Sequence, residues 1–246
     1  MRRSLFATVI LLLGCSDWRA DAAPYAIDDT DVVAPHSLAL AVFSEGRTNA
    51  GPESGSTFGL ELEYGVAPRL EVSAALPVGS SAAVRGRTRL DVSHIEFGFK
   101  YGIVDSARSL LPTIVFAPST DLSFGSGRNE DHATHVFLPL WLEKPWGGWT
   151  LRGGAGYRIN PGRDECNAVF YGVGFSKGLG DRLSVGGEIY RETSPVRNEP
   201  AAAAFNVGGT YDVSDNVQIE VSAGSALTTR SGNSGLNYYF GVQWEV

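Results

Sequence analysis

Histidine is scarce in this chain, and one stretch gathers several residues that could bind a metal ion. His132 and His135 stand beside Glu130 and Asp131. No CxxC, HExxH or EF-hand spacing accompanies them, so we expect a solvated acidic loop there, with no metal and no other cofactor.

A nucleophile with a partnering base is not evident either. Ser93 and His94 are neighbours in an extended stretch, where adjacent side chains point to opposite faces and cannot hydrogen-bond as a dyad. The glycine-rich residues 153–156 open no helix and so do not form a nucleotide-binding loop. The sequence therefore predicts no catalytic residues and no enzymatic activity.

Charged residues instead recur at every second position of segments with alternating polarity. In residues 57–66, Phe58 and Leu60 share one parity, while Glu61 and Glu63 share the other. This period of two predicts β-strands with one apolar and one polar face. The charged residues that we assign to polar faces in this way are Glu61, Glu63, Glu71, Glu96, Lys100, Arg152, Arg158, Glu188 and Glu220.

About twelve such segments follow one another, and their connections alternate between long and short. The short connections lie at residues 67–69, 105–109, 146–148, 180–182 and 214–216, and are rich in Pro, Gly, Asp and Asn. The long connections lie at residues 44–56, 79–91, 119–133, 161–167, 193–200 and 226–235. Residues 134–145 are apolar on both parities, so the facing of that segment stays open.

This organisation is typical of a transmembrane antiparallel up-and-down β-barrel, with short periplasmic turns and long extracellular loops. Such a sheet must close, because an open edge would leave backbone N–H and C=O groups unpaired in hydrocarbon. A water-soluble β-sandwich or barrel is the alternative, but it does not explain why the connections alternate. It also leaves unexplained the aromatic residues near the short-turn side, which suit a membrane interface: Tyr64, Tyr101, Trp146, Trp149, Phe175, Tyr211 and Trp244.

In a membrane barrel the polar faces point inward, so the nine charged residues above become candidate lumen-lining residues. They either select and guide a solute or neutralise one another across the barrel. Inward glycines leave space for a narrow channel, or relieve crowding in a curved sheet. These glycines are Gly59, Gly98, Gly154, Gly156, Gly186, Gly208 and Gly224.

The chain divides into three parts. Residues 1–22 have the basic start, apolar run and small-residue cleavage site of a secretory signal peptide, although a lipobox-like stretch leaves lipidation of Cys15 open. We assign residues 23–35 to an N-terminal periplasmic segment and residues 36–246 to the outer-membrane barrel. The last strand, within 236–246, should pair with residues 38–43 to close the barrel and be recognised by the outer-membrane barrel assembly machinery.

Composition excludes some partners. The formal net charge of −7 and the pI of about 5.1 argue against nucleic-acid binding, which usually requires a basic surface. No interior window holds the ~20 consecutive apolar residues of a membrane-spanning helix.

Several hairpins resemble those of a known family. Residues 58–72 with Leu76-Pro77-Val78, residues 95–101, residues 141–151 and the closing residues 240–244 are similar to the outer-membrane "meta-pathway of phenol degradation" family of transporters. The resemblance implies uptake of aromatic or other hydrophobic compounds across the outer membrane. The family defines no binding residues that can be transferred to this chain.

We therefore expect a channel or transporter that lets small, hydrophobic or aromatic solutes pass passively through a polar, glycine-rich lumen. Its partners would be outer-membrane lipid and the solute. One alternative is a structural or adhesin-like barrel with a plugged lumen and partner-binding loops. Another is a barrel enzyme acting on lipids, for which no nucleophile constellation is found.

Overall fold

The computed structural model describes residues 24–48, 55–81, 89–92, 94–123, 134–162, 165–228 and 235–246. The predicted signal peptide with Cys15, as well as Ser93 and His132, lies outside these residues, as do parts of the predicted long loops. No helix among the described residues is long and apolar enough to cross a membrane.

Strands make up nearly all of the regular structure within the described ranges. One short 3₁₀ helix, η1 (Ser106–Arg108), lies in a turn. The strands are β1 (Leu38–Thr48), β2 (Gly55–Ala67), β3 (Leu70–Ser81), β4 (Arg89–Asp91), β5 (His94–Val104), β6 (Thr113–Phe116), β7 (Ser119–Ser123), β8 (His135–Trp146), β9 (Trp149–Ile159), β10 (Ala168–Gly178), β11 (Leu183–Glu192), β12 (Ala202–Ser214), β13 (Val217–Thr228) and β14 (Leu236–Glu245).

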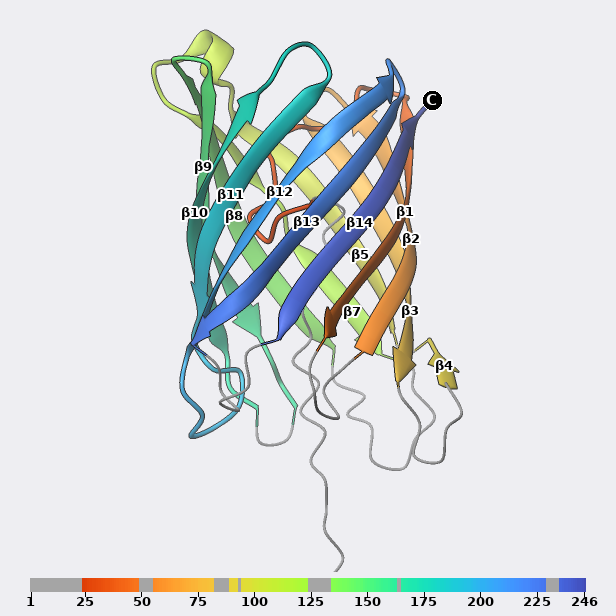
Figure 1. Ribbon diagram of the computed structural model, residues 1–246, viewed down its shortest axis with the longest axis vertical. Helices are drawn as coiled ribbons and strands as arrows, with labels where there is room; N and C mark the ends of the chain where they lie inside the picture. Colours follow the sequence, from red (N-terminus) through yellow and green to blue (C-terminus); the bar gives the residue numbers. More distant parts are fainter. Residues whose placement is uncertain are drawn as a thin grey trace, which may run out of the picture.

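These segments form a closed antiparallel barrel of twelve strands (Figure 1). β4 and β5 both pair with β3, and β6 and β7 both pair with β5 and β8, so each of these pairs is one interrupted strand. The barrel closes where β1 pairs with β14, with Leu40 opposite Trp244. At that seam Leu38 and Val246 exchange backbone hydrogen bonds of 2.9 and 2.7 Å. The predicted fold class is confirmed.

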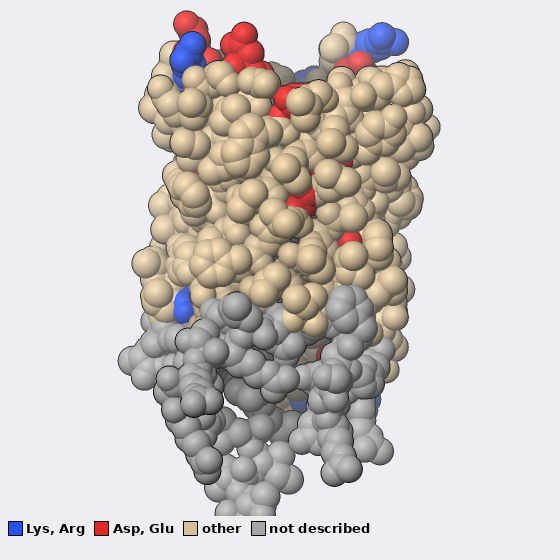
Figure 2. All heavy atoms as spheres, turned by 90° about the vertical axis from the view of Figure 1, so that its right-hand side faces the viewer, with Lys and Arg blue, Asp and Glu red and all other residues tan. Residues whose placement is uncertain are grey.

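Side chains alternate between the outer surface and the lumen. In β2, Phe58 and Leu60 are exposed on the outside, whereas Glu61 is buried and Glu63 half-buried on the inside. Figure 2 shows a face of the wall made mostly of uncharged residues, with charged side chains gathered on the upper rim. A closed barrel with an apolar outer surface satisfies its backbone groups internally, as hydrocarbon requires. The protein is an outer-membrane β-barrel.

The short turns lie together at the end of the barrel where the chain also ends (Figure 1). Between β8 and β9, Gly147 and Gly148 have positive φ angles of 58° and 83°, and Trp146 pairs with Trp149 across them. This is a two-residue hairpin of the type I′ kind, whose twist matches the flanking strands and which glycine adopts without strain.

Several strands extend beyond their predicted limits. β1 continues to Thr48, past the predicted end at Phe43, and β7 occupies Ser119–Ser123, where the sequence predicted a loop. The cause in β1 is the backbone ladder: residues 44–47 pair with both β2 and β14, and Thr48 with β14, after the apolar alternation has ended. Hydrophobic periodicity therefore underestimates strand length here.

The N-terminal segment comprises residues 24–37; residues 24–33 lie inside the barrel, and residues 34–37 lead to β1 (Figure 1). We expected residues 23–35 to be an N-terminal periplasmic segment; the part described from residue 24 contacts opposite parts of the inner wall before β1 begins. Ile27, only 1% exposed, packs against the inner wall, and the side chains of Glu71, Lys100 and Glu188 bind the segment. The reason is local: this stretch carries both the apolar and the charged residues that the inner wall complements.

We predict that a charge on the outer surface destabilises the barrel according to its depth. Val173, in the middle of β10, is 62% exposed, and Leu179 follows the end of the same strand. Val173→Arg should lower the free energy of unfolding by about 2–4 kcal/mol, because it places a cation in hydrocarbon, and Leu179→Arg by about 0–1 kcal/mol near the interface. Guanidinium unfolding in lipid vesicles, followed by tryptophan fluorescence, measures both. Equal costs at the two positions would contradict the membrane placement of β10.

Candidate functional site: the lumen and its N-terminal segment

The first attachment of the N-terminal segment is the carboxylate of Glu188 on β11. The backbone N–H groups of Ala26 and Ile27 donate to its two oxygens at 2.8 and 2.9 Å. Asn206 on β12 adds a side-chain hydrogen bond of 2.6 Å to the same carboxylate. The segment here is irregular, so its N–H groups have no strand partner and a side chain of the wall accepts from them instead.

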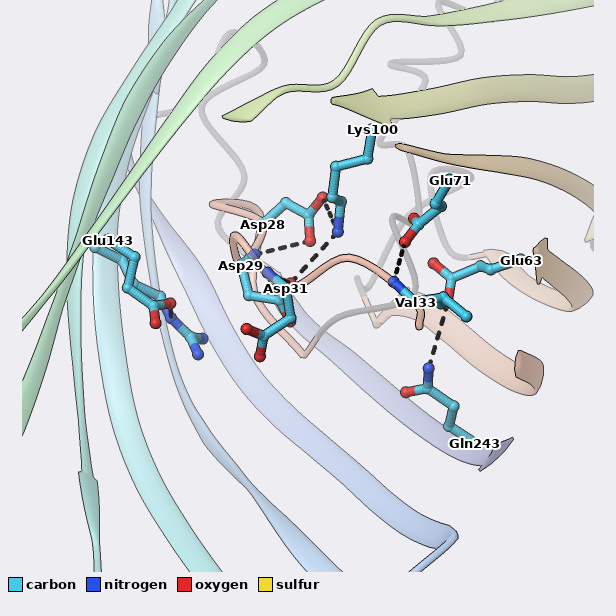
Figure 3. Close-up of polar contacts among 10 residues, drawn as sticks. Asp28, Asp29, Asp31, Val33, Glu63, Glu71, Lys100, Glu143 and Gln243 are labelled. Carbon is cyan, nitrogen blue, oxygen red and sulfur yellow. Dashed lines mark hydrogen bonds and ion pairs between the residues drawn. The ribbon is translucent and has the colours of Figure 1, made fainter. Parts of the chain in front are cut away.

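The second attachment is ionic. Lys100 on β5 points into the lumen between Asp28 and Asp29, with Nζ at 3.2 and 3.3 Å from their carboxylates (Figure 3). Burial would raise the pKa of Asp29, but the Lys100 ammonium and the Arg152 guanidinium outweigh it and hold that pKa below its usual value. The charge of Asp29 and then burial raise the pKa of Asp31. Lys100 therefore keeps Asp29 ionised and the segment bound.

The third attachment lies where the segment leaves the lumen. Glu71 on β3 accepts from the backbone N–H of Val33 at 2.7 Å (Figure 3). His36 then donates its backbone N–H to the carbonyl of Gly65 at 2.7 Å. A Cβ atom at Gly65 would lie 2.0 Å from the carbonyl oxygen of Ala34, so only glycine lets the segment approach β2 this closely.

A cavity of about 810 Å³ occupies the lumen between this segment and the short-turn end. Asp28, Asp29, Asp31 and Val33 line it from the segment, and Asp181, Arg182 and Asp215 line it near the turns. Among the described residues that line it, Lys100 and Arg182 are the only cationic ones. The acidic ones number twelve: Asp28, Asp29, Asp31, Glu61, Glu63, Glu71, Glu96, Asp181, Asp212, Asp215, Glu220 and Glu245. The cavity is therefore strongly acidic.

The residues predicted to line the lumen fall into two groups. Glu61, Glu63, Glu71, Glu96, Lys100 and Glu220 all line the acidic cavity. The remaining three lie on the other side of the barrel and hold structural contacts: Arg152 with Glu143 at 2.8 Å, Arg158 with Glu192 at 3.0 Å, and Glu188 with the segment. Whether any of them guides a solute stays a prediction.

Sequence reasoning missed an apolar cluster on the inner wall. Ile27 packs there with Val115, Phe137, Trp141, Phe170, Tyr190 and Ala204. The signal was present in β8, whose apolar residues occupy both parities: Phe137 and Trp141 point inward, while Leu140 and Leu142 are exposed outside. Phe170 and Tyr190 add aromatic rings on the inward parity of β10 and β11.

Beside some inward glycines the space is occupied by an aromatic ring and is not open. A Cβ atom at Gly154 would lie 2.3 Å from the ring of Trp141, and one at Gly156 would lie 2.3 Å from the ring of Phe137. The ring of Phe43 takes up the space beside Gly59 in the same way, with 2.0 Å to a Cβ atom there. Of the two alternatives for the inward glycines, relief of crowding applies at these positions, because a ring from a neighbouring strand fills the space.

Near the long-loop end, His135 does not join a metal site within the part of the chain that is described. Its Nε2 lies 3.0 Å from Glu165, which also accepts from the backbone N–H of Gly162. No group of three or more His, Cys, Asp or Glu side chains among the described residues could hold a metal ion.

Solved structures share this fold at low sequence identity. The COG4313 outer membrane channel from Pseudomonas putida F1 matches with a TM-score of 0.64 and 13% identity, over 89% of this chain and 98% of that one. The NanC porin matches with a TM-score of 0.63 and 10% identity, over 84% of this chain and 100% of that one. The translocator domain of the autotransporter NalP from Neisseria meningitidis matches with a TM-score of 0.53 and 14% identity, over 85% of this chain and 87% of that one.

The search of curated proteins found no match. Among protein families, by contrast, one model matches most of the barrel, residues 64–242, from the end of β2 into β14. That match includes β3 and β5 with Glu71 and Lys100, as well as the strands that carry the apolar cluster. The chain belongs to the family described as "Putative MetA-pathway of phenol degradation".

Proposed function

We propose that this protein is an outer-membrane channel for the passive passage of small solutes, among them hydrophobic or aromatic ones. The observation that carries the proposal is the cavity of about 810 Å³, which extends through the lumen from the short-turn end to the N-terminal segment. A barrel whose only task was to anchor loops would need no such space. Two of the similar structures are described as a channel and a porin, and the family description names phenol degradation.

The charge of the cavity sets what passes most readily. Rings of Asp and Glu favour cations in channels, and here twelve acidic residues face two cationic ones. Inorganic anions are therefore disfavoured, whereas cations and small uncharged molecules are not. This agrees with an uncharged aromatic solute and excludes its conjugate anion as the preferred form.

The N-terminal segment is the obstacle in this path. It is joined to three different parts of the wall, through Glu188, Lys100 and Glu71, so it restricts passage on the side of the cavity away from the short turns. This observation also favours a second candidate, a structural or adhesin-like barrel whose lumen is permanently plugged. Conductance decides between the two.

We predict that the purified protein conducts in planar lipid bilayers, with a reversal potential in a KCl gradient that shows preference for K⁺. Glu61→Gln with Glu63→Gln should shift that potential toward the chloride side, because both residues line the cavity. Glu199→Gln is the matched control, since Glu199 is an exposed residue outside the strands. Absence of conductance in correctly folded protein would overturn the channel and favour the plugged barrel.

We predict that Lys100→Met raises the single-channel conductance. The variant removes the ammonium group that lies 3.2 and 3.3 Å from the carboxylates of Asp28 and Asp29. Because the segment then loses its ionic attachment, it should leave its position more often. Lys177→Met is the control, because Lys177 contacts the ring of Trp149 on the outer surface. If Lys100→Met conducts no better than the wild type, the segment does not limit passage.

A further inference from the structure

The apolar cluster of the lumen is confined to one part of the inner wall. Val115 on β6, Phe137 and Trp141 on β8, Phe170 on β10 and Tyr190 on β11 bring their side chains together there. Most of the remaining inner wall is polar, as barrel interiors usually are. We call these five residues, together with Ala204 on β12, the aromatic niche.

The rings of the niche meet in edge-to-face geometry. The ring centroids of Trp141 and Phe170 are 5.9 Å apart with an interplanar angle of 84°, and those of Phe137 and Phe170 are 6.1 Å apart at 87°. Phe170 and Tyr190 are tilted by 31° at 5.5 Å. This arrangement presents both ring edges and ring faces, and another aromatic ring packs favourably against either.

The present occupant of the niche is Ile27. Its side chain is 1% exposed, and it comes from the irregular N-terminal segment rather than from the wall. Glycines keep the space for it: a Cβ atom at Gly172 would lie 2.9 Å from Cδ1 of Ile27 and 2.7 Å from Cβ of Tyr190. A side chain that belongs to no strand thus fills a recess that the barrel wall forms by itself.

The segment separates the niche from the acidic cavity. Val32 and Ala117 line the cavity, and both also pack against the niche cluster. Movement of the segment would therefore join the two spaces. The attachments that hold it are separate side-chain contacts at Glu188, Lys100 and Glu71 rather than a strand ladder, so they can be exchanged without opening the barrel.

Glu188 gives the niche one polar edge. Its carboxylate accepts from the N–H of Ile27 at 2.9 Å and from that of Ala26 at 2.8 Å. When Ile27 leaves, this buried carboxylate loses two donors, which is costly unless the new occupant supplies one. An aromatic ring that carries a hydroxyl group would fill the recess and donate to Glu188.

We propose that the aromatic niche is a binding site for an uncharged, single-ring aromatic molecule bearing a hydrogen-bond donor, and that Ile27 competes with this ligand for it. The inference rests on the proposed channel function, for which it names the class of solute and the place where the solute pauses. Binding requires that the N-terminal segment withdraw Ile27. The apparent affinity of the wild type is thus reduced by the fraction of molecules in which Ile27 occupies the niche.

The test is equilibrium dialysis of p-cresol and toluene against the full mature protein in lipid nanodiscs, with empty nanodiscs as the blank. Removal of the competitor by Ile27→Ala should lower the Kd for p-cresol at least about tenfold. Filling the recess with Ala204→Phe should abolish binding. Phe43→Leu is the matched control, because Phe43 is an equally buried lumen residue that packs on Tyr239 outside the niche.

The same samples test the role of Glu188. In the Ile27→Ala protein, p-cresol should bind more tightly than toluene, and adding Glu188→Gln should reduce that preference. A heat-modifiability gel, in which folded and boiled protein migrate differently, confirms that each variant has formed its barrel. Ile27 and Glu188 can be changed without altering the strand ladder, so folded variants are expected.

Three outcomes would overturn the niche: an unchanged Kd in Ile27→Ala, binding retained in Ala204→Phe, or the same gain in Phe43→Leu. Conductance of the same variants separates this inference from the channel. If the protein conducts but p-cresol binding depends on neither Ile27 nor Ala204, the niche is not the binding site, while the channel proposal stands. If p-cresol binding follows the expected pattern but the protein does not conduct, the channel proposal is wrong, while the binding site stands.

Discussion

The structure depends on one constraint: every backbone N–H and C=O group that faces hydrocarbon must be paired inside the protein. The pairing of β1 with β14 meets it, because this pairing removes the last sheet edge. The seam continues to the end of the chain, where Leu38 and Val246 exchange hydrogen bonds. In a closed barrel each strand side chain points either to the outer surface or into the lumen, because the sheet has only these two faces.

Side chains that face the lumen are not restricted to apolar types, and in this chain they form two different regions. Toward the short turns it gathers carboxylates around an open space, while on the β6–β12 side it gathers aromatic rings. Carboxylates so close together repel one another, and Lys100 offsets part of that repulsion at the place where the N-terminal segment adds Asp28 and Asp29. Lys100 therefore both reduces the negative charge of the cavity and binds the segment next to Ile27. The charge of the cavity and the position of Ile27 are linked through this one side chain.

Much of the wall was predictable from the sequence, because a period of two directly reflects a strand with two different surroundings. Residues 57–66 show this, with Leu60 outside and Glu61 inside as predicted. The aromatic niche was harder to predict, because β8 is apolar on both faces and periodicity then gives no direction. Rings and glycines that fit together across strands, such as Trp141 with Gly154, depend on register, which only the pairing of β8 with β9 fixes.

The position of the N-terminal segment was beyond such reasoning for a different reason. Residues 24–35 have no periodicity, and their place is set by complementary groups far away in the sequence: Glu188 lies 161 positions from Ile27, and Glu71 lies 38 positions from Val33. These contacts also show why the segment need not be a fixed part of the fold. Removal of a strand would leave a whole ladder of backbone groups unpaired. Withdrawal of this segment deprives Glu188 of two donors and uncovers Glu71 and Lys100, which already line the cavity. Water and solute can reach those side chains, so the lumen can exchange its own chain for a ligand while the wall remains intact.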